Sequence, residues 1–334
     1  MSQRTIDTHS HILTQETAAL LTKASPKTPV TLTPFDKDNA ELKVGDVPYR
    51  PFPIGGYDIA HRLRDMDAAG VDVQVLSATP QTYLYNLGDE LSPVLAAIQN
   101  DQIAKHVAAY PTRFMGIGTL PIAQPQGAAD ELRRAMTKLG LRGAMIASNI
   151  QGRYLDDPGF EPLWATAEEL GAFMFIHPNN VAAADRLKPY YLTNLIGNPL
   201  DTTIGAASLI FGGVMDRYPK LKIVLAHGGG FTPYQAARWE HGWKVRPEPK
   251  KNVKEQPKGI AKRFIYDTIL HSDKTLEAMI GLVGSDHVVL GSDYPYDMAM
   301  LDCVAHVRSL NIPDVDKTAI LGGHAETLLK GKAS

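Results

Sequence analysis

Residues 5–11 carry two histidines whose spacing suits a metal ion. In a β-strand the side-chain period of two places Asp7, His9 and His11 on one face. The interior of a parallel barrel is normally filled by Val, Ile and Leu, so inward polar groups would lack partners unless something binds them. Two imidazoles on one face can reach a single cation. We therefore interpret this run as part of a metal site.

Three further apolar runs also end in a side chain that can bind a metal or move a proton. Residues 172–177 end at His177, residues 222–227 at His227 and residues 288–293 at Asp293. For a single strand, a histidine that caps the core with one hydrogen bond is an equally good explanation. Four such runs together favour a site, because a barrel brings all its strand ends to one rim.

His9, His11, His177 and Asp293 are predicted to hold one divalent cation. Three neutral imidazoles and a carboxylate form an N3O set that suits Zn²⁺ best and also accepts Mn²⁺, Fe²⁺ or Co²⁺. A second metal ion would need a bridging ligand at a neighbouring strand end. Residues 141–148 end without Lys, Glu or Asp, so we expect a single ion.

His227 is the candidate base for proton transfer. It precedes Gly228-Gly229-Gly230, where the backbone can turn sharply and let substrate or water approach. Because imidazole titrates near neutral pH, the favoured role is activation of water bound to the metal; a fifth metal ligand is the alternative. The glycine run lacks the spacing of a phosphate-binding loop.

The elements that must position these residues alternate along the chain. Eight β-rich runs are expected at 5–11, 71–77, 113–120, 141–148, 172–177, 221–227, 263–268 and 287–293. Amphipathic segments with helical spacing lie between them, at 57–69, 91–109, 127–139, 160–170, 200–217 and 274–283. Eight strand and helix units predict an α/β fold, a (β/α)8 TIM barrel, with residues 1–334 as one domain.

Two stretches, residues 13–56 and 178–199, interrupt this alternation. Both follow strands directly, which places them at the carboxyl end of the barrel, where such enzymes build their pockets. We expect residues 13–56 to be an insertion after strand 1 that covers the barrel mouth; an ordinary surface excursion is the alternative.

The composition limits the function classes. The chain has 334 residues, 44% hydrophobic and 21% charged, with a formal net charge of -2. No basic face is evident for nucleic acid or anionic membrane, so a small molecule is the expected partner. Cys303 is the single cysteine, and no apolar run resembles a signal peptide or a membrane span of about 20 residues. We expect a cytoplasmic protein.

Several motifs resemble those of the amidohydrolase superfamily, and within it the branch of metal-dependent decarboxylases typified by 2-amino-3-carboxymuconate-6-semialdehyde decarboxylase. They are Asp7-x-His9-x-His11, His177-Pro178, His227-Gly-Gly-Gly and Gly291-Ser292-Asp293-Tyr294-Pro295. The resemblance extends over nearly the whole chain. It implies the same four metal ligands, with His227 and Asp293 as the catalytic residues.

The resemblance also implies residues that contact substrate. Arg50 matches an arginine that grips the substrate carboxylate, and Arg246 matches another near the pocket. Arg238 has the spacing of an arginine that reaches the neighbouring subunit's site, which implies a homodimer or higher homo-oligomer. After His177 the branch has an aromatic-rich segment that is absent from this sequence, and Tyr190 and Tyr191 are expected to replace it in part. This departure leaves the substrate identity open.

The expected reaction is the non-oxidative decarboxylation of an unsaturated or aromatic carboxylic acid, similar to aminocarboxymuconate semialdehyde. Two alternatives would use the same ligands: a hydrolase of an amide or lactone, and a hydratase of a conjugated dicarboxylate. A barrel that binds metal without turnover is a third, which the unliganded base beside the ligands argues against.

Overall fold

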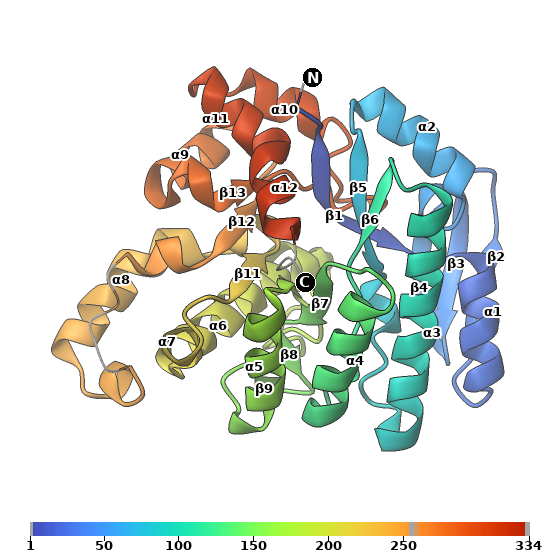
Figure 1. Ribbon diagram of the computed structural model, residues 1–334, viewed down its shortest axis with the longest axis horizontal. Helices are drawn as coiled ribbons and strands as arrows, with labels where there is room; N and C mark the ends of the chain where they lie inside the picture. The colour runs from blue at the N-terminus through green and yellow to red at the C-terminus, as the bar shows by residue number, and fades with distance from the viewer. Residues whose placement is uncertain (1–2, 254–256, 258, 331–334) are drawn as a thin grey trace.

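Eight parallel strands form the centre of the computed structural model, which describes residues 3–253, 257 and 259–330 (Figure 1). They are β1 (Ile6–Ile12), β5 (Val73–Ala78), β6 (Phe114–Gly116), β7 (Gly143–Ala147), β10 (Phe173–His177), β11 (Lys222–Leu225), β12 (Ile265–Asp267) and β13 (Val288–Val289). Each of the eight runs expected from the sequence overlaps one of them.

Backbone hydrogen bonds join the two strand groups β1-β5-β6 and β7-β10-β11-β12-β13 at both edges. After β6, the Gly118 amide donates to the Gly143 carbonyl at 2.9 Å. On the other side, the Thr8 amide of β1 donates to the Leu290 carbonyl after β13, also at 2.9 Å. The sheet therefore closes on itself, which confirms the predicted TIM barrel.

Helices surround the strands (Figure 1). The predicted amphipathic segments correspond to α2 (Ile59–Ala69), α3 (Gly88–Ala109), α4 (Pro125–Thr137), α5 (Glu161–Leu170), α6 (Asn198–Phe211) with α7 (Val214–Arg217), and α9 (Asp273–Val283). Further helices are α8 (Thr232–Val245), α10 (Cys303–Ser309), α11 (Asp314–Thr318) and α12 (His324–Leu329). In Figure 1, α8 extends away from the barrel.

The unit formed by α5 and β10 shows how the sequence builds towards the site. Helix α5 buries Leu163 and Trp164 against the barrel and ends at Gly171, whose φ of 63° suits a residue without a Cβ. Strand β10 follows, and all of its residues are buried. Its apolar residues fix the strand in the core and bring His177 to the carboxyl-terminal rim.

Residues 13–56 contain regular structure that the sequence pattern did not predict. Helix α1 (Gln15–Ala24) precedes an antiparallel sheet of β2 (Val30–Pro34), β3 (Asn39–Val44) and β4 (Val47–Pro53). Leu32, Leu42 and Phe52 are buried in this sheet and belong to a small hydrophobic cluster of its own. Burial alternates along β2 and β3, and Phe52 is the one buried residue of β4, so each of these short strands offers at most two buried apolar positions to the sequence pattern.

None of the helices in the described part of the chain is long and apolar enough to span a membrane.

Candidate active site

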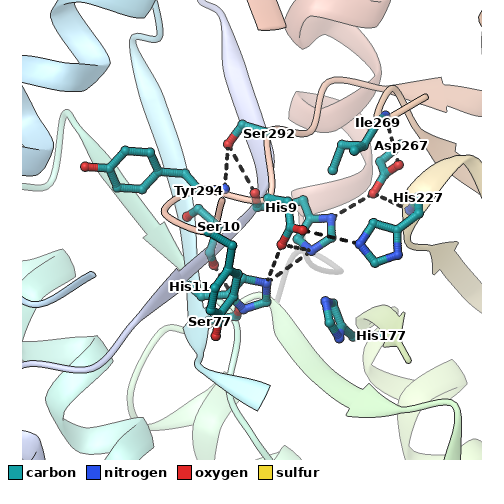
Figure 2. Close-up of polar contacts among 12 residues, drawn as sticks. His9, Ser10, His11, Ser77, His177, His227, Asp267, Ile269, Ser292 and Tyr294 are labelled. Carbon is teal, nitrogen blue, oxygen red and sulfur yellow. Dashed lines mark hydrogen bonds and ion pairs between the residues drawn. The ribbon is translucent and has the colours of Figure 1, made fainter. Parts of the chain in front are cut away.

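Four buried side chains from three parts of the barrel rim meet at one point (Figure 2). His9 and His11 come from β1, His177 from the end of β10, and Asp293 from the loop after β13. One ligand atom from each lies within 4.8 Å of the others. The Nε2 atoms of His9 and His11 are 3.1 Å apart, and they lie 3.3 and 3.2 Å from Asp293 Oδ1. The predicted ligand set is thus brought together in an arrangement that could hold a metal ion.

The loop that carries Asp293 is held from behind by Asp7. The Asp7 carboxylate accepts hydrogen bonds from the Ser292 amide at 3.0 Å, the Ser292 hydroxyl at 2.6 Å and the Gln74 side chain at 3.0 Å. Asp293 itself has a φ of 61°, in the left-handed region, so these contacts stabilise an unfavourable backbone conformation. Asp7, expected from its strand position to need a bound partner, is satisfied by protein groups instead.

The imidazole tautomers favour metal binding. His9 Nδ1 donates to Asp267 Oδ2 at 2.7 Å, and His177 Nδ1 donates to the Pro178 carbonyl at 2.9 Å. Because a carboxylate and a carbonyl only accept, the proton of each neutral ring lies on Nδ1 and the Nε2 lone pair faces the site. His177 Nε2 is buried and has no hydrogen-bond partner. An orphaned buried acceptor beside two more imidazoles and a carboxylate fits a divalent cation.

Burial and charge set the ionisation of these groups. Burial lowers the pKa of His11 to about 4 and that of His177 well below its usual value, so both rings are neutral and able to bind metal at neutral pH. Burial also lowers the pKa of His9, but the Asp293 and Asp267 carboxylates reverse this and raise it overall; the same charges attract a metal cation. Burial opposes ionisation of Asp293, yet the charge on His9 brings its pKa well below the usual value.

His227 lies beside the four ligands, immediately after β11. Its Nε2 is 3.4 Å from Asp293 Oδ2, and its ring centroid is 5.4 Å from those of His9 and His177. Its φ of 56° turns the chain sharply at this point. The side chain lines the cavity above the ligands, where a substrate can reach it.

Asp267, at the end of β12, is a site residue that was missed in the sequence. Besides accepting from His9, its Oδ2 accepts from the His227 amide at 3.0 Å. Its Oδ1 accepts from the amide of Ile269 at 3.2 Å (Figure 2). The same atom accepts from the amide of Gly228 at 2.8 Å. One carboxylate therefore positions both a metal ligand and the candidate base. The signal in the sequence was an acidic residue near the end of the expected β-rich run 263–268.

A cavity of about 340 Å³ opens above the metal ligands. His177, His227 and Asp293 lie at its base, and Tyr49, Tyr191 and Tyr296 contribute aromatic walls. Amide side chains supply most of its remaining polar groups, from Gln81, Asn179, Asn180, Asn194 and Asn198. The volume is within the range of about 300–1,000 Å³ that is usual for small-molecule sites.

Of the predicted substrate-binding residues, Tyr191 lines this cavity. Arg50 is exposed, and its guanidinium carbon lies 3.7 Å from the centroid of the Phe35 ring. Its neighbour Tyr49 on β4 lines the cavity instead, as expected when adjacent strand residues point to opposite faces.

Arg238 and Arg246 both belong to the region of α8. Arg238 is exposed on the helix, and Arg246 follows its last residue. The Arg246 Nε donates to Glu248 Oε2 at 3.1 Å. Among the residues described as lining the cavity above the metal ligands, none is Arg or Lys. A single chain thus brings the metal ligands, His227 and Tyr191 together but not the three arginines.

Comparison with known proteins agrees with this geometry. The family model described as amidohydrolase matches residues 6–331. A 2-amino-3-carboxymuconate-6-semialdehyde decarboxylase from Dictyostelium discoideum is 35% identical over 322 residues, covering 96% of this chain and 90% of that protein. A γ-resorcylate decarboxylase from Polaromonas sp. is 29% identical over 292 residues, covering 80% and 86%.

Solved structures are similar over almost their whole length. The 5-carboxyvanillate decarboxylase of Sphingomonas paucimobilis superposes with a TM-score of 0.83 at 30% identity, covering 98% of this chain and 99% of that one. A dihydroxybenzoic acid decarboxylase from Polaromonas sp., solved with manganese and the inhibitor 2-nitroresorcinol, has a TM-score of 0.81 at 26% identity, covering 99% and 97%. The chain belongs to the amidohydrolase family.

Proposed function

We propose that this protein is a metal-dependent, non-oxidative decarboxylase of an unsaturated or aromatic carboxylic acid. The observation that carries the proposal is the convergence of four buried ligands at the base of a cavity, with an imidazole beside them. The relatives are decarboxylases by name, which favours decarboxylation over hydrolysis of an amide or lactone and over hydration of a conjugated dicarboxylate. An acid similar to aminocarboxymuconate semialdehyde is the first substrate to test.

The metal proposed is Zn²⁺, because three imidazoles and one carboxylate suit it best. Mn²⁺ is the alternative, since a similar structure was solved with manganese. A divalent cation held by His9, His11, His177 and Asp293 supplies positive charge and Lewis acidity to oxygen atoms of substrate or water.

His227 and Asp293 would carry out the proton transfer in this reaction. His227 takes up a proton at Nε2 and transfers it to the carbon that bears the departing carboxylate, with Asp293 at 3.4 Å to stabilise the imidazolium. The carbon to carboxylate bond then breaks, its electron pair remains in the conjugated system, and a carbon to hydrogen bond replaces it. No oxidant or reductant is required.

We also propose that Arg50, Arg238 and Arg246 recognise substrate carboxylates together with Tyr191, with Arg238 acting in a neighbouring subunit of a homodimer or higher homo-oligomer. Mixing of two inactive variants tests this. If Arg238 serves the partner's site, chains with His227→Asn and chains with Arg238→Ala should recover about a quarter of the wild-type activity when mixed equally. No recovery after subunit exchange would contradict the shared site.

The arrangement of the whole chain is part of the proposal. We propose that residues 1–334 form one domain and that residues 13–56 cover the barrel mouth, which is supported by Tyr49 of β4 at the cavity wall. A cytoplasmic location remains a prediction from the sequence.

Isotope labelling tests the reaction class. The metal-loaded enzyme is incubated in ¹⁸O-labelled water with hydroxybenzoic and muconate-type acids, and CO2 and product are analysed by mass spectrometry. We expect CO2 in equal amount to product and no ¹⁸O in the product. A product that carries ¹⁸O and forms without CO2 would identify a hydrolase or hydratase.

A further inference from the structure

A second cavity adjoins the one above the metal ligands. Its volume is about 540 Å³, larger than the 340 Å³ of the first. Five residues line both cavities: Tyr49, Pro80, Gln81, Asn179 and Asn180. The second cavity continues from this shared wall to Leu42 and Val44 of β3, on the segment of residues 13–56. The metal centre therefore has space beside it that exceeds what the first cavity provides.

The walls of this second cavity carry no charge among the described residues that line it. The apolar and aromatic part comes from Leu42, Val44, Val47, Pro48, Tyr49, Pro80, Tyr83, Leu84 and Tyr85. The polar part consists of hydroxyl and amide groups only, from Thr28, Gln81, Asn86, Asn149, Gln151, Asn179 and Asn180. An ionised group placed here would lose its hydration and meet no side chain of opposite charge, which is unfavourable. An apolar group would be stabilised by its transfer from water into the cavity.

Hydrogen bonds within the protein fix the shared wall. The side-chain amide of Asn149 donates to the backbone carbonyls of Asn179 and Asn180 at 2.9 and 3.1 Å. Gln81 Oε1 accepts from the Tyr296 hydroxyl at 2.7 Å. The Asn149 side-chain amide, the backbone carbonyls of Asn179 and Asn180 and the side-chain oxygen of Gln81 are thus already paired, so this wall is fixed before a ligand binds.

We propose that the second cavity is a substrate subsite for an uncharged apolar or aromatic substituent. The acid would place its carboxylate at the metal ligands and its substituent past Tyr49 and Gln81, against Val44 and the aromatic pair Tyr83 and Tyr85, whose ring centroids are 5.4 Å apart. This inference rests on the proposed decarboxylation. It narrows the substrate class to unsaturated or aromatic acids that carry such a substituent.

A substituent series tests the subsite. Hydroxybenzoic acids with hydrogen, methyl, ethyl or propyl at each free ring position are assayed for CO2 release. At the position that points into the subsite, kcat/KM should rise about fourfold for each buried methylene. A carboxymethyl group of similar size at that position should lower it below that of the unsubstituted acid.

Two variants at Val44, which is half-buried, locate the effect. Val44→Phe should reduce kcat/KM for the propyl acid to the value for the unsubstituted acid. With this variant, kcat/KM for the unsubstituted acid should stay within about twofold of the wild-type value, a change of about 0.4 kcal/mol or less in activation free energy. Val44→Ala should leave kcat/KM for the propyl acid above that for the unsubstituted acid. Val315→Phe, at an exposed position on α11, is the matched control and should not change kcat/KM for either acid. Metal content and melting temperature establish that each variant is folded.

The outcomes separate the subsite from the function. The subsite proposal would be overturned if kcat/KM did not change with substituent length at any ring position and Val44→Phe had no effect. Equal slowing of all acids by Val44→Phe would make the cavity an entry route and also overturn it. Calorimetric binding of the corresponding alkyl nitrophenols gives a readout without turnover. Affinity that rises along this series without any CO2 release would support the subsite and refute the decarboxylase proposal.

Discussion

Replacing Asp267 with asparagine should weaken the metal site although Asp267 is not a ligand. The carboxylate serves four donors: Oδ2 accepts from His9 Nδ1 and the His227 amide, and Oδ1 accepts from the amides of Gly228 and Ile269. Asparagine has one acceptor oxygen, so in either orientation two of these donors face an NH2 group. If His9 is one of them, its proton moves to Nε2 and the ring can no longer bind the ion.

The expected size of the effect follows from these contacts. Loss of a partner that orients a metal ligand typically lowers affinity by about 10–100-fold, which is about 1.4–2.7 kcal/mol. After the His9 proton has moved, the His227 amide is the one buried donor without an acceptor; in the other orientation of the asparagine the Gly228 and Ile269 amides lack one. The cost in stability is therefore about 1–6 kcal/mol. A chain of 334 residues has an unfolding entropy of about 0.7 kcal/mol/K, so the melting temperature should fall by about 1–9 °C.

Metal titration under a competing chelator measures the affinity, and calorimetry measures the melting temperature. Asp286→Asn is the control, because that carboxylate is 76% exposed and lies away from the ligands. An Asp267→Asn chain that binds metal as tightly as the wild type, with unchanged melting temperature, would refute the role assigned to Asp267.

Further predictions concern the base, the metal and the cavity wall. His227→Asn should keep about one metal ion per chain but lower kcat by about 10²–10⁴-fold; loss of the metal in elemental analysis would make His227 a ligand instead. A chelator should lower the melting temperature by about 4 °C relative to enzyme with metal at 100 times its Kd, and an unchanged melting curve would exclude a metal bound to the folded state. Asp201→Asn should raise KM at unchanged metal content, because Asp201 accepts from Asn149 and the Ala182 amide at 2.8 and 3.0 Å and so holds the cavity wall; a fall in kcat alone, with KM unchanged, would contradict this.

The barrel was predictable because its strands are short, apolar and evenly separated by helical segments. Buried parallel strands such as β10 read as continuous apolar runs, and the closure of the barrel follows from their number. The sheet of residues 13–56 was missed because its strands are short and each buries at most two apolar residues, as in the small cluster that includes Leu32 and Phe52. Helix α8 was not predicted either; it buries only Thr232 and Pro233, so its apolar residues follow no regular stripe.

The candidate metal ligands were predictable because they lie within or shortly after buried strands, towards the strand ends that converge in a barrel. The groups that support them were not. Asp267 acts through hydrogen bonds to backbone amides of another strand end, which only the folded chain brings within reach. The second cavity likewise depends on how β3 packs beside the residues after β5. The spacing of residues in the sequence indicates which side chains reach the barrel rim. Which groups face them across the rim depends on the packing of the folded chain.

The most direct test of this account is the metal content of the purified protein, by elemental analysis, beside that of His177→Ala. His177 Nε2 is a buried atom without a partner, so the account assigns it to the ion. We predict about one divalent ion per chain in the wild type and less than about a tenth of that in the variant, with both chains folded. A wild-type protein without stoichiometric metal, or a variant that keeps it, would contradict the central claim.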